Sequence, residues 1–139
     1  MSIRIILADD HEVMREGLRA LLFRQPDFEV VSCVSNGKEA LDEARRTMPD
    51  VIIMDIRMPE MDGIQATQEL LRDLPDAKVL CLSMHHNAAC VRSALAAGAS
   101  GYLVKDCALT EIVDAVRIIH KGRQYLSPEV QSSVKNSRY

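Results

Sequence analysis

The sequence predicts an α/β fold in which five parallel strands form a doubly wound sheet with five helices on its two faces. Three observations favour this fold. Five short apolar runs alternate with five segments of helical periodicity, and the connections between them are short. The 139 residues suit one domain, and 47% hydrophobic and 27% charged residues are typical of a globular protein. Tryptophan is absent and only 4% of residues are aromatic, so the core is expected to be aliphatic.

The first third of the chain gives two strands and one helix. Residues 3–8 are an apolar run that leads directly into the acid pair Asp9-Asp10. Residues 12–24 then place apolar side chains on one face at helical spacing, which predicts an amphipathic helix. A second apolar run, residues 28–34, predicts the next strand.

The middle of the chain holds the most informative strand. A helix is predicted over residues 36–46, with Asn36 as its cap. Residues 51–55 follow, where four apolar residues run into Asp55, a pattern typical of a strand buried on both faces. An Asp-Gly pair then begins a helix over residues 62–73.

The alternation continues to residue 121. Two more strands and two more helices are predicted, over residues 78–83, 87–97, 101–104 and 109–121. Gly98 and Gly122 end these two helices, as glycine commonly does. We therefore expect one domain over residues 1–122 and an extension or linker over residues 123–139.

Reactive side chains lie where the predicted strands end. They are Asp9-Asp10, Asp55, Ser83 and Lys105. Because the carboxyl ends of parallel strands share one edge of the sheet, these side chains should converge there. The carboxylates would repel one another, and a divalent cation would relieve that repulsion. Ligands that are all oxygen favour Mg²⁺ or Mn²⁺ over Zn²⁺.

This set of groups suits phosphoryl transfer, in which catalysis consists mostly of positioning and charge neutralisation. Asp55 would be the nucleophile, because carboxylates can form acyl phosphates. The metal would hold one phosphoryl oxygen, Lys105 a second and the Ser83 hydroxyl a third. Each strand end thereby has a distinct expected role.

The chain resembles the response-regulator receiver domain of two-component signalling, over roughly residues 1–122. The resemblance rests on Asp9-Asp10, on the segment Asp55-Ile56-Arg57-Met58-Pro59-Glu60-Met61-Asp62-Gly63, on Ser83 and on residues 97–105. Asp9-Asp10-His11, Gly101-Tyr102-Leu103-Val104-Lys105-Asp106 and residues 122–128 are similar to the NarL/FixJ subfamily. The resemblance implies a flavodoxin-like fold with strand order 2-1-3-4-5.

The resemblance also implies roles for individual residues. Asp55 would take a phosphoryl group from a sensor histidine kinase, and Asp10 and Asp55 would bind Mg²⁺ directly, together with the backbone carbonyl of Arg57. Asp9 would act on the metal largely through water. The expected switch residues are Ser83 and Tyr102, and phosphorylation would draw Ser83 inward so that the Tyr102 ring could enter the space beneath it. Arg57 and His85 would flank the phosphoryl group and tune its hydrolysis, and the long Arg57 side chain favours a long-lived phosphoryl group.

Further expectations concern the whole protein. A phosphorylation-dependent homodimer is expected, together with transcriptional control through a DNA-binding helix-turn-helix domain beyond this chain. No apolar run is long enough to span a membrane, and we expect a cytoplasmic signalling domain rather than an enzyme.

Two departures from the family pattern follow Lys105. Asp106 stands where many receivers have a proline with a cis peptide bond, and a cis bond costs about 3 kcal/mol before other residues, so that geometry is not assumed. Ala108 stands where a capping residue is expected, which should weaken the start of the last helix by about 1 kcal/mol.

Several alternatives remain open. The chain could be a Mg²⁺-dependent phosphatase with an aspartyl-phosphate intermediate, or an interaction module with an inactive pocket. Tyr102 could be a packed aromatic residue, and His11 could do no more than line the pocket. Cys33 and Cys81 lie in apolar strand runs and are expected to be small core residues.

Overall fold

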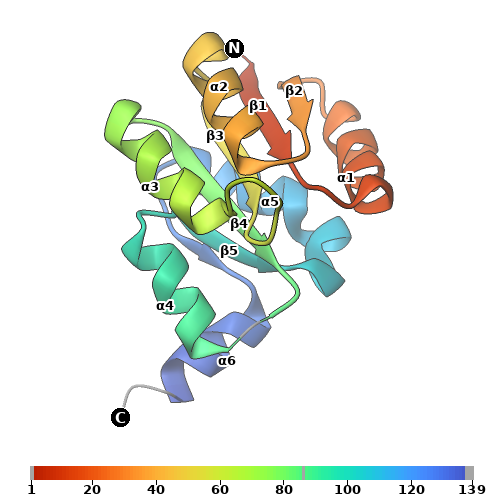
Figure 1. Cartoon of the computed structure of the whole chain (residues 1–139). Helices are drawn as coiled ribbons and strands as arrows, with labels where there is room; N and C mark the ends of the chain where they lie inside the picture. Colours follow the sequence, from red (N-terminus) through yellow and green to blue (C-terminus); the bar gives the residue numbers. More distant parts are fainter. Residues whose placement is uncertain (1, 86, 137–139) are drawn as a thin grey trace.

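The computed structural model describes residues 2–85 and 87–136 and shows a sheet with helices on both faces (Figure 1). The strands are β1 (Ile3–Ala8), β2 (Phe28–Val34), β3 (Val51–Asp55), β4 (Lys78–Ser83), β5 (Gly101–Val104) and β6 (Tyr125–Leu126). The helices are α1 (Glu12–Phe23), α2 (Gly37–Thr47), α3 (Gly63–Asp73), α4 (Ala88–Ala96), α5 (Ala108–His120) and α6 (Pro128–Asn136), with a 3₁₀ turn η1 (Lys105–Cys107) before α5.

The sheet order is β2-β1-β3-β4-β5-β6, and every neighbouring pair is parallel. The doubly wound α/β class and the order of the first five strands are therefore confirmed. The expected counts of five strands and five helices are too low, because β6 extends the sheet beyond β5 and α6 follows it. A strand was not predicted there, because β6 has only two residues and so has no recognisable apolar run.

Two apolar layers enclose the sheet. The helices α2, α3 and α4 cover one face, and α1 and α5 cover the other. β3 contributes to both layers, because Ile52 and Met54 face the first and Val51 and Ile53 face the second. All five residues of β3 are buried, as its apolar run predicted.

Most helix starts agree with the sequence. Side chains of Asn36, Asp62 and Asn87 cap α2, α3 and α4 by accepting hydrogen bonds from backbone N–H groups two or three residues into each helix. α5 begins at Ala108, so its cap position is Cys107, one residue before the expected position at Ala108, and Cys107 makes no side-chain capping bond. No peptide bond in residues 2–85 and 87–136 is cis, so Lys105 and Asp106 are joined by a trans bond.

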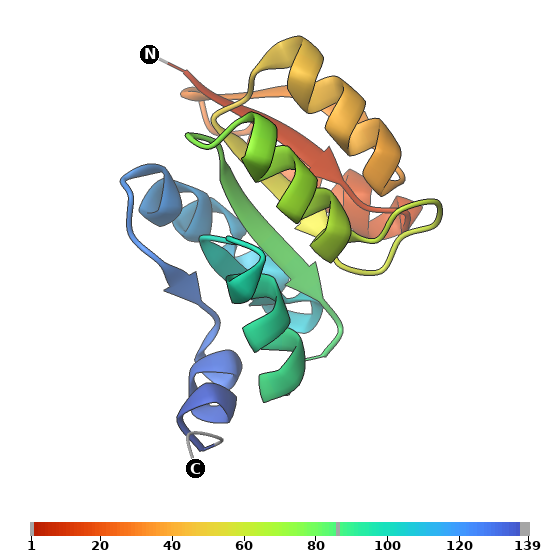
Figure 2. The same cartoon turned by 60° about the vertical axis from the view of Figure 1, so that its left-hand side comes forward.

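The C-terminal segment packs on the domain (Figure 2). The N–H of Tyr125 donates to the Ser100 carbonyl (3.1 Å), and the N–H of Ser127 donates to the Tyr102 carbonyl (3.0 Å). The Val130 side chain is fully buried, and α6 lies beside α4. The division between residues 122 and 123 stays a prediction. Residues 137–139 of the expected linker lie outside the described part.

One cysteine differs from its expected position. Cys81 is fully buried in β4, as predicted, but Cys33 is exposed. The prediction was wrong for Cys33 because β2 is an edge strand, and several of its side chains are only partly covered by the neighbouring helices. Among the described residues, no helix has the length and apolar character needed to cross a bilayer.

Candidate functional site

The side chains at the strand ends converge, as the sequence predicted. Asp9 follows β1, Asp55 ends β3, Ser83 ends β4 and Lys105 follows β5. A pocket of about 290 Å³ opens at this edge of the sheet and is lined by Asp10, His11, Asp55, Arg57, Ser83, Met84, His85 and Lys105. Parallel strands that end together therefore bring together residues almost 100 positions apart in the sequence.

Lys105 is the cation at the centre of this pocket, and its side chain is only 3% exposed. Its Nζ donates to Asp55 Oδ2 (2.8 Å) and to Asp9 Oδ1 (3.3 Å), and it lies 2.8 Å from His11 Nδ1. An ammonium group has three N–H donors and no acceptor. All three donors of Lys105 thus have acceptors within reach.

Asp55 is a buried carboxylate beside this cation, with 2% of its surface exposed. Burial, and to a smaller extent the nearby Asp9, raise the pKa of Asp55 to about 6 against the opposing effect of Lys105. The backbone N–H of Arg57 donates to Asp55 Oδ1 (3.2 Å). Asp55 is therefore held in place at the floor of the pocket.

Asp9 is fully buried, and its two carboxylate oxygens have different surroundings. Its Oδ1 accepts from the His11 backbone N–H (2.8 Å), whereas Oδ2 has no hydrogen-bond partner among the described residues. An unpaired buried carboxylate oxygen is costly, so a group that binds it would be stabilising. Oxygens of Asp9, Asp10 and Asp55 and a nitrogen of His11 lie within 4.8 Å of one another. The three carboxylates of this group suit a divalent cation that prefers oxygen ligands.

Ser83 and Tyr102 meet at the loop that follows β4. Ser83 is buried, and its Oγ accepts from the His85 N–H (3.0 Å). The Tyr102 ring is fully buried in the core, and its hydroxyl donates to the His85 carbonyl (2.7 Å). Burial raises the pKa of Tyr102 to about 12. The ring already lies inside the core, where it was expected only after phosphorylation. Its role as a switch stays a prediction.

Arg57 and His85 lie at the rim of the pocket, and both side chains are exposed. They stand on the loops after β3 and β4 and belong to the lining of the pocket. Their roles beside a group bound to Asp55 stay a prediction.

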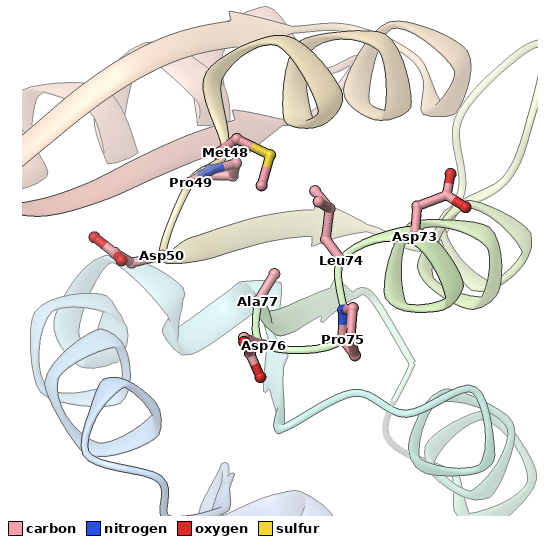
Figure 3. A pocket seen from close by; sticks show the side chains of 8 residues that line it. All are labelled: Met48, Pro49, Asp50, Asp73, Leu74, Pro75, Asp76 and Ala77. Carbon is pink, nitrogen blue, oxygen red and sulfur yellow. The ribbon is translucent and has the colours of Figure 1, made fainter.

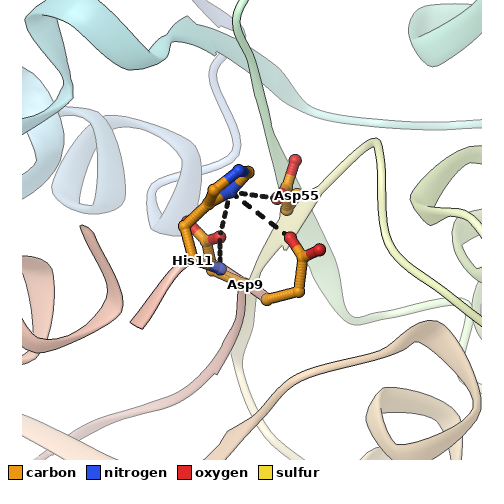
Figure 4. A group of neighbouring side chains, drawn as sticks. Asp9, His11 and Asp55 are labelled. Carbon is orange, nitrogen blue, oxygen red and sulfur yellow. Dashed lines mark hydrogen bonds and ion pairs between the residues drawn. The ribbon is translucent and has the colours of Figure 1, made fainter. Parts of the chain in front are cut away.

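His11 contacts the acidic side chains of the pocket, beyond the lining role that its sequence position suggested. Its Nδ1 lies 3.2 Å from Asp9 Oδ1, 3.3 Å from Asp10 Oδ1 and 3.6 Å from Asp55 Oδ2. Figure 4 shows the Asp9 and Asp55 side chains pointing toward its ring. The only sequence signal for this contact is that His11 directly follows the acid pair.

A second pocket of similar size, about 300 Å³, lies at the opposite end of the strands (Figure 3). Two of its three aspartates are engaged within the fold, because Asp73 pairs with Arg45 (2.7 Å) and Asp50 accepts from the Arg4 N–H (2.9 Å). Among the described residues that line this second pocket, there is no buried cationic side chain and no buried carboxylate oxygen without a partner. The pocket near Asp55 has both in its surroundings. The chemistry is therefore concentrated at the carboxyl ends of the strands.

Comparison with known proteins shows which family the chain resembles. The profile of the response regulator receiver domain family matches residues 5–117. The transcriptional regulatory protein DegU of Brevibacillus brevis is 41% identical over 129 residues, which cover 93% of this chain and 55% of DegU. The chain spans about 55 to 65% of the length of the curated relatives it matches.

Solved structures show the same fold. A LuxR-family two-component response regulator from an Aurantimonas species superposes with a TM-score of 0.94 at 36% identity, covering 99% of both chains. The signal receiver domain of a putative NarL response regulator from Mycobacterium tuberculosis superposes with a TM-score of 0.83 at 39% identity, covering 88% of this chain and 98% of that one.

Proposed function

The chain belongs to the response regulator receiver domain family, among relatives of the NarL/LuxR type, and from this premise we propose that Asp55 accepts a phosphoryl group from a sensor histidine kinase. The observation that carries the proposal is the buried Asp55 carboxylate, 2.8 Å from the Lys105 ammonium group in an open pocket. A carboxylate in this setting can attack phosphorus, and the neighbouring cation stabilises the charge that develops on the phosphoryl oxygens.

Receiver domains generally bind Mg²⁺ at an acidic pocket, and the residues here fit that ion. The unpaired buried Oδ2 of Asp9 supports the fit, as do the clustered oxygens of Asp10 and Asp55. We assign Asp9, Asp10, Asp55 and the backbone carbonyl of Arg57 to the site for Mg²⁺, with Mn²⁺ as a substitute. When bound, the ion neutralises negative charge on the phosphoryl group.

Lys105 and Ser83 are the groups of this chain that would hold the phosphoryl oxygens. Lys105 already points at Asp55, and Ser83 lies on the neighbouring strand end with its Oγ bonded to the His85 N–H. Phosphorylation replaces the single charge of the Asp55 carboxylate with a phosphoryl group that carries about two negative charges, and these would attract the Ser83 hydroxyl. Tyr102 shares the His85 backbone as a partner, so a movement of this loop would reach the Tyr102 hydroxyl. The surface of α4, β5 and α5 is the proposed output.

For the whole protein we propose phosphorylation-dependent homodimerisation and transcriptional control through a DNA-binding domain joined to the segment 123–139. The name of the relative DegU, a transcriptional regulatory protein, supports this assignment. The protein would act in the cytoplasm, where sensor kinases present their phosphohistidine.

The chain is a signalling domain, and we propose that it assists its own phosphotransfer and dephosphorylation without turning over a substrate. A phosphatase with an aspartyl-phosphate intermediate usually has a second acid two residues after the nucleophile. Arg57 stands at that position and its side chain is exposed. Release of phosphate from an aryl phosphate far above one equivalent per chain would favour the phosphatase instead.

The proposal is tested by incubating the chain with Mg²⁺ and acetyl phosphate, followed by intact-mass measurement and size-exclusion chromatography. We expect one phosphoryl adduct per chain, absent in Asp55→Asn, and a shift toward the dimer on modification. A wild-type chain without an adduct under these conditions would refute the proposal. Adduct formation that persists in Asp55→Asn would move the acceptor to another residue.

A further inference from the structure

The His11 ring lies in the pocket that the proposed phosphoryl group would occupy. Its Nδ1 is 2.8 Å from Lys105 Nζ, as close as the Asp55 oxygen that Lys105 also contacts. Because an ammonium group only donates hydrogen bonds, Nδ1 accepts in this contact. The third donor of Lys105 is therefore directed at His11 rather than at a free position in the pocket.

The surroundings of the ring indicate that it is held weakly. A nitrogen that accepts from Lys105 cannot also donate to the carboxylates, yet Asp9 Oδ1 and Asp10 Oδ1 lie only 3.2 and 3.3 Å from it. Those two contacts place the lone pair of Nδ1 close to lone pairs of the carboxylate oxygens, which is repulsive. The side chain is also 59% exposed, so little packing opposes its movement into solvent. By contrast, the Lys105 side chain is 3% exposed and stays fixed between Asp9 and Asp55.

We propose that His11 is an internal competitor for Lys105: its imidazole holds the third Lys105 donor until a phosphoryl oxygen displaces it. The inference rests on the proposed function, since it concerns the same site. In this arrangement His11 is a positioning residue that keeps the Lys105 ammonium group between the two aspartates. It also lowers the affinity of the pocket for a phosphoryl group, because the Lys105–His11 hydrogen bond must break first.

The sequence around His11 allows the competition to be tested without unfolding the helix. His11 is the residue before α1, and its side chain makes no capping bond. Its backbone N–H donates to Asp9 Oδ1 whichever side chain stands at this position. His11→Ala therefore removes the acceptor and leaves the backbone contact in place. His11→Gln keeps a side-chain acceptor, and glutamine is not a favoured capping residue. His120→Ala, at the exposed end of α5, is the matched control.

The probe is beryllofluoride, a phosphoryl mimic, titrated by calorimetry into the full chain at saturating Mg²⁺, after the affinity for Mg²⁺ alone has been measured. We expect His11→Ala to bind beryllofluoride about fivefold more tightly than wild type, the equivalent of one exchanged hydrogen bond. His11→Gln and His120→Ala should bind like wild type. ¹⁵N spectra of the free wild-type chain should show the His11 proton on Nε2, with an Nδ1 resonance that shifts when beryllofluoride binds.

Each alternative result overturns the proposal in a recognisable way. Beryllofluoride binding by His11→Ala that is unchanged or weaker would show that the ring does not compete for Lys105. The same conclusion would follow if His11→Ala bound only Mg²⁺ more tightly. Equal tightening in His11→Gln would show that the acceptor is irrelevant. A proton on His11 Nδ1 would exclude the contact itself. A wild-type chain that binds no beryllofluoride at all would refute the proposed function, and the competition with it.

Discussion

At the level of single residues, Asp55 is a buried carboxylate whose charged form is destabilised by its surroundings. Its carboxylate is buried at the end of β3, and its pKa lies near 6 because the cost of burial exceeds the stabilisation from Lys105. Such a group is tolerated in a folded protein when function requires it. The Asp9 oxygen that has no hydrogen-bond partner is also destabilising. A bound cation is expected to reduce the energetic cost of both carboxylates.

The raised pKa gives a pH-dependence of stability in Mg²⁺-free buffer. Between about pH 4 and pH 6 the folded chain holds a proton that the unfolded chain, with a carboxyl pKa of 3.8, has released. The contribution of Asp55 to the free energy of unfolding therefore falls as pH rises through that window. The stability difference between Asp55→Asn and wild type should grow by about 1 to 2 kcal/mol from pH 4 to pH 7, after allowance for solvent screening. Urea unfolding at several pH values measures it, and a constant difference would contradict the raised pKa.

Arg57 gives a prediction about how long the phosphoryl group lasts. Its exposed side chain at the rim is expected to hinder the attacking water, so Arg57→Ala should shorten the half-life several-fold. Arg72→Ala changes another exposed arginine, on α3, and should leave the half-life unchanged. Decay of the adduct mass after removal of acetyl phosphate gives the rates. A half-life of only seconds in the wild type would count against a shielding role for Arg57.

Among the elements, the loop between β3 and α3 sets the position of Asp55. The Gly63 N–H donates to the Ile56 carbonyl (2.8 Å), which folds the loop back over the end of β3. A Cβ at Gly63 would lie 2.1 Å from the Asp55 carbonyl oxygen. Only glycine allows this close approach of two backbones.

Gly63→Ala should therefore lower the free energy of unfolding by about 2 to 3 kcal/mol and weaken beryllofluoride binding, because the Asp55 backbone must move. Gly17→Ala is the control, since Gly17 lies inside α1 and its Cβ would meet only the flexible end of Leu109 at 3.3 Å. Alanine also favours a helix by up to about 1 kcal/mol over glycine. Equal effects of the two substitutions, measured by chemical denaturation, would contradict the close-approach argument.

At the scale of the whole molecule, the segment after Gly122 is joined to the sheet but is not central to either core layer. β6 bonds to β5, Ser127 Oγ accepts from the Val104 N–H (3.2 Å), and Val130 adds one fully buried side chain. The remaining core residues come from residues 3–119. The domain boundary near residue 122 stays a prediction, in which the segment after it is a docked extension.

A chain ending at residue 124 should accordingly fold cooperatively, but with a free energy of unfolding about 2 to 4 kcal/mol lower than that of the full chain. The loss reflects the buried Val130 side chain and the hydrogen bonds that Ser127 makes with β5. Urea unfolding measures the difference, and beryllofluoride binding should persist because no pocket residue is removed. A shortened chain without a cooperative transition would place the boundary later than residue 122.

Much of the fold and of the candidate site follows from local sequence signals. The apolar run before Asp55 predicted a fully buried strand, and the caps at Asn36 and Asp62 begin their helices as expected. Once the strands are parallel, Asp9, Asp55, Ser83 and Lys105 must meet at one edge. Periodicity and capping act within a few residues, which is why they can be read without a structure.

Tertiary packing decided what no local signal could. β6 has only two residues and exists because the β5 edge offers backbone partners. Cys33 is exposed because β2 lies at the edge of the sheet rather than inside it. His11 contacts Lys105 across 94 positions of sequence, and that distance depends on how the ends of β1 and β5 sit across the pocket. The sequence by itself thus determined the strands, the helices and the acids at their ends. Only the packed structure determined which donors and acceptors face each other, because hydrogen bonds depend on distances of a few tenths of an ångström that many distant contacts set together.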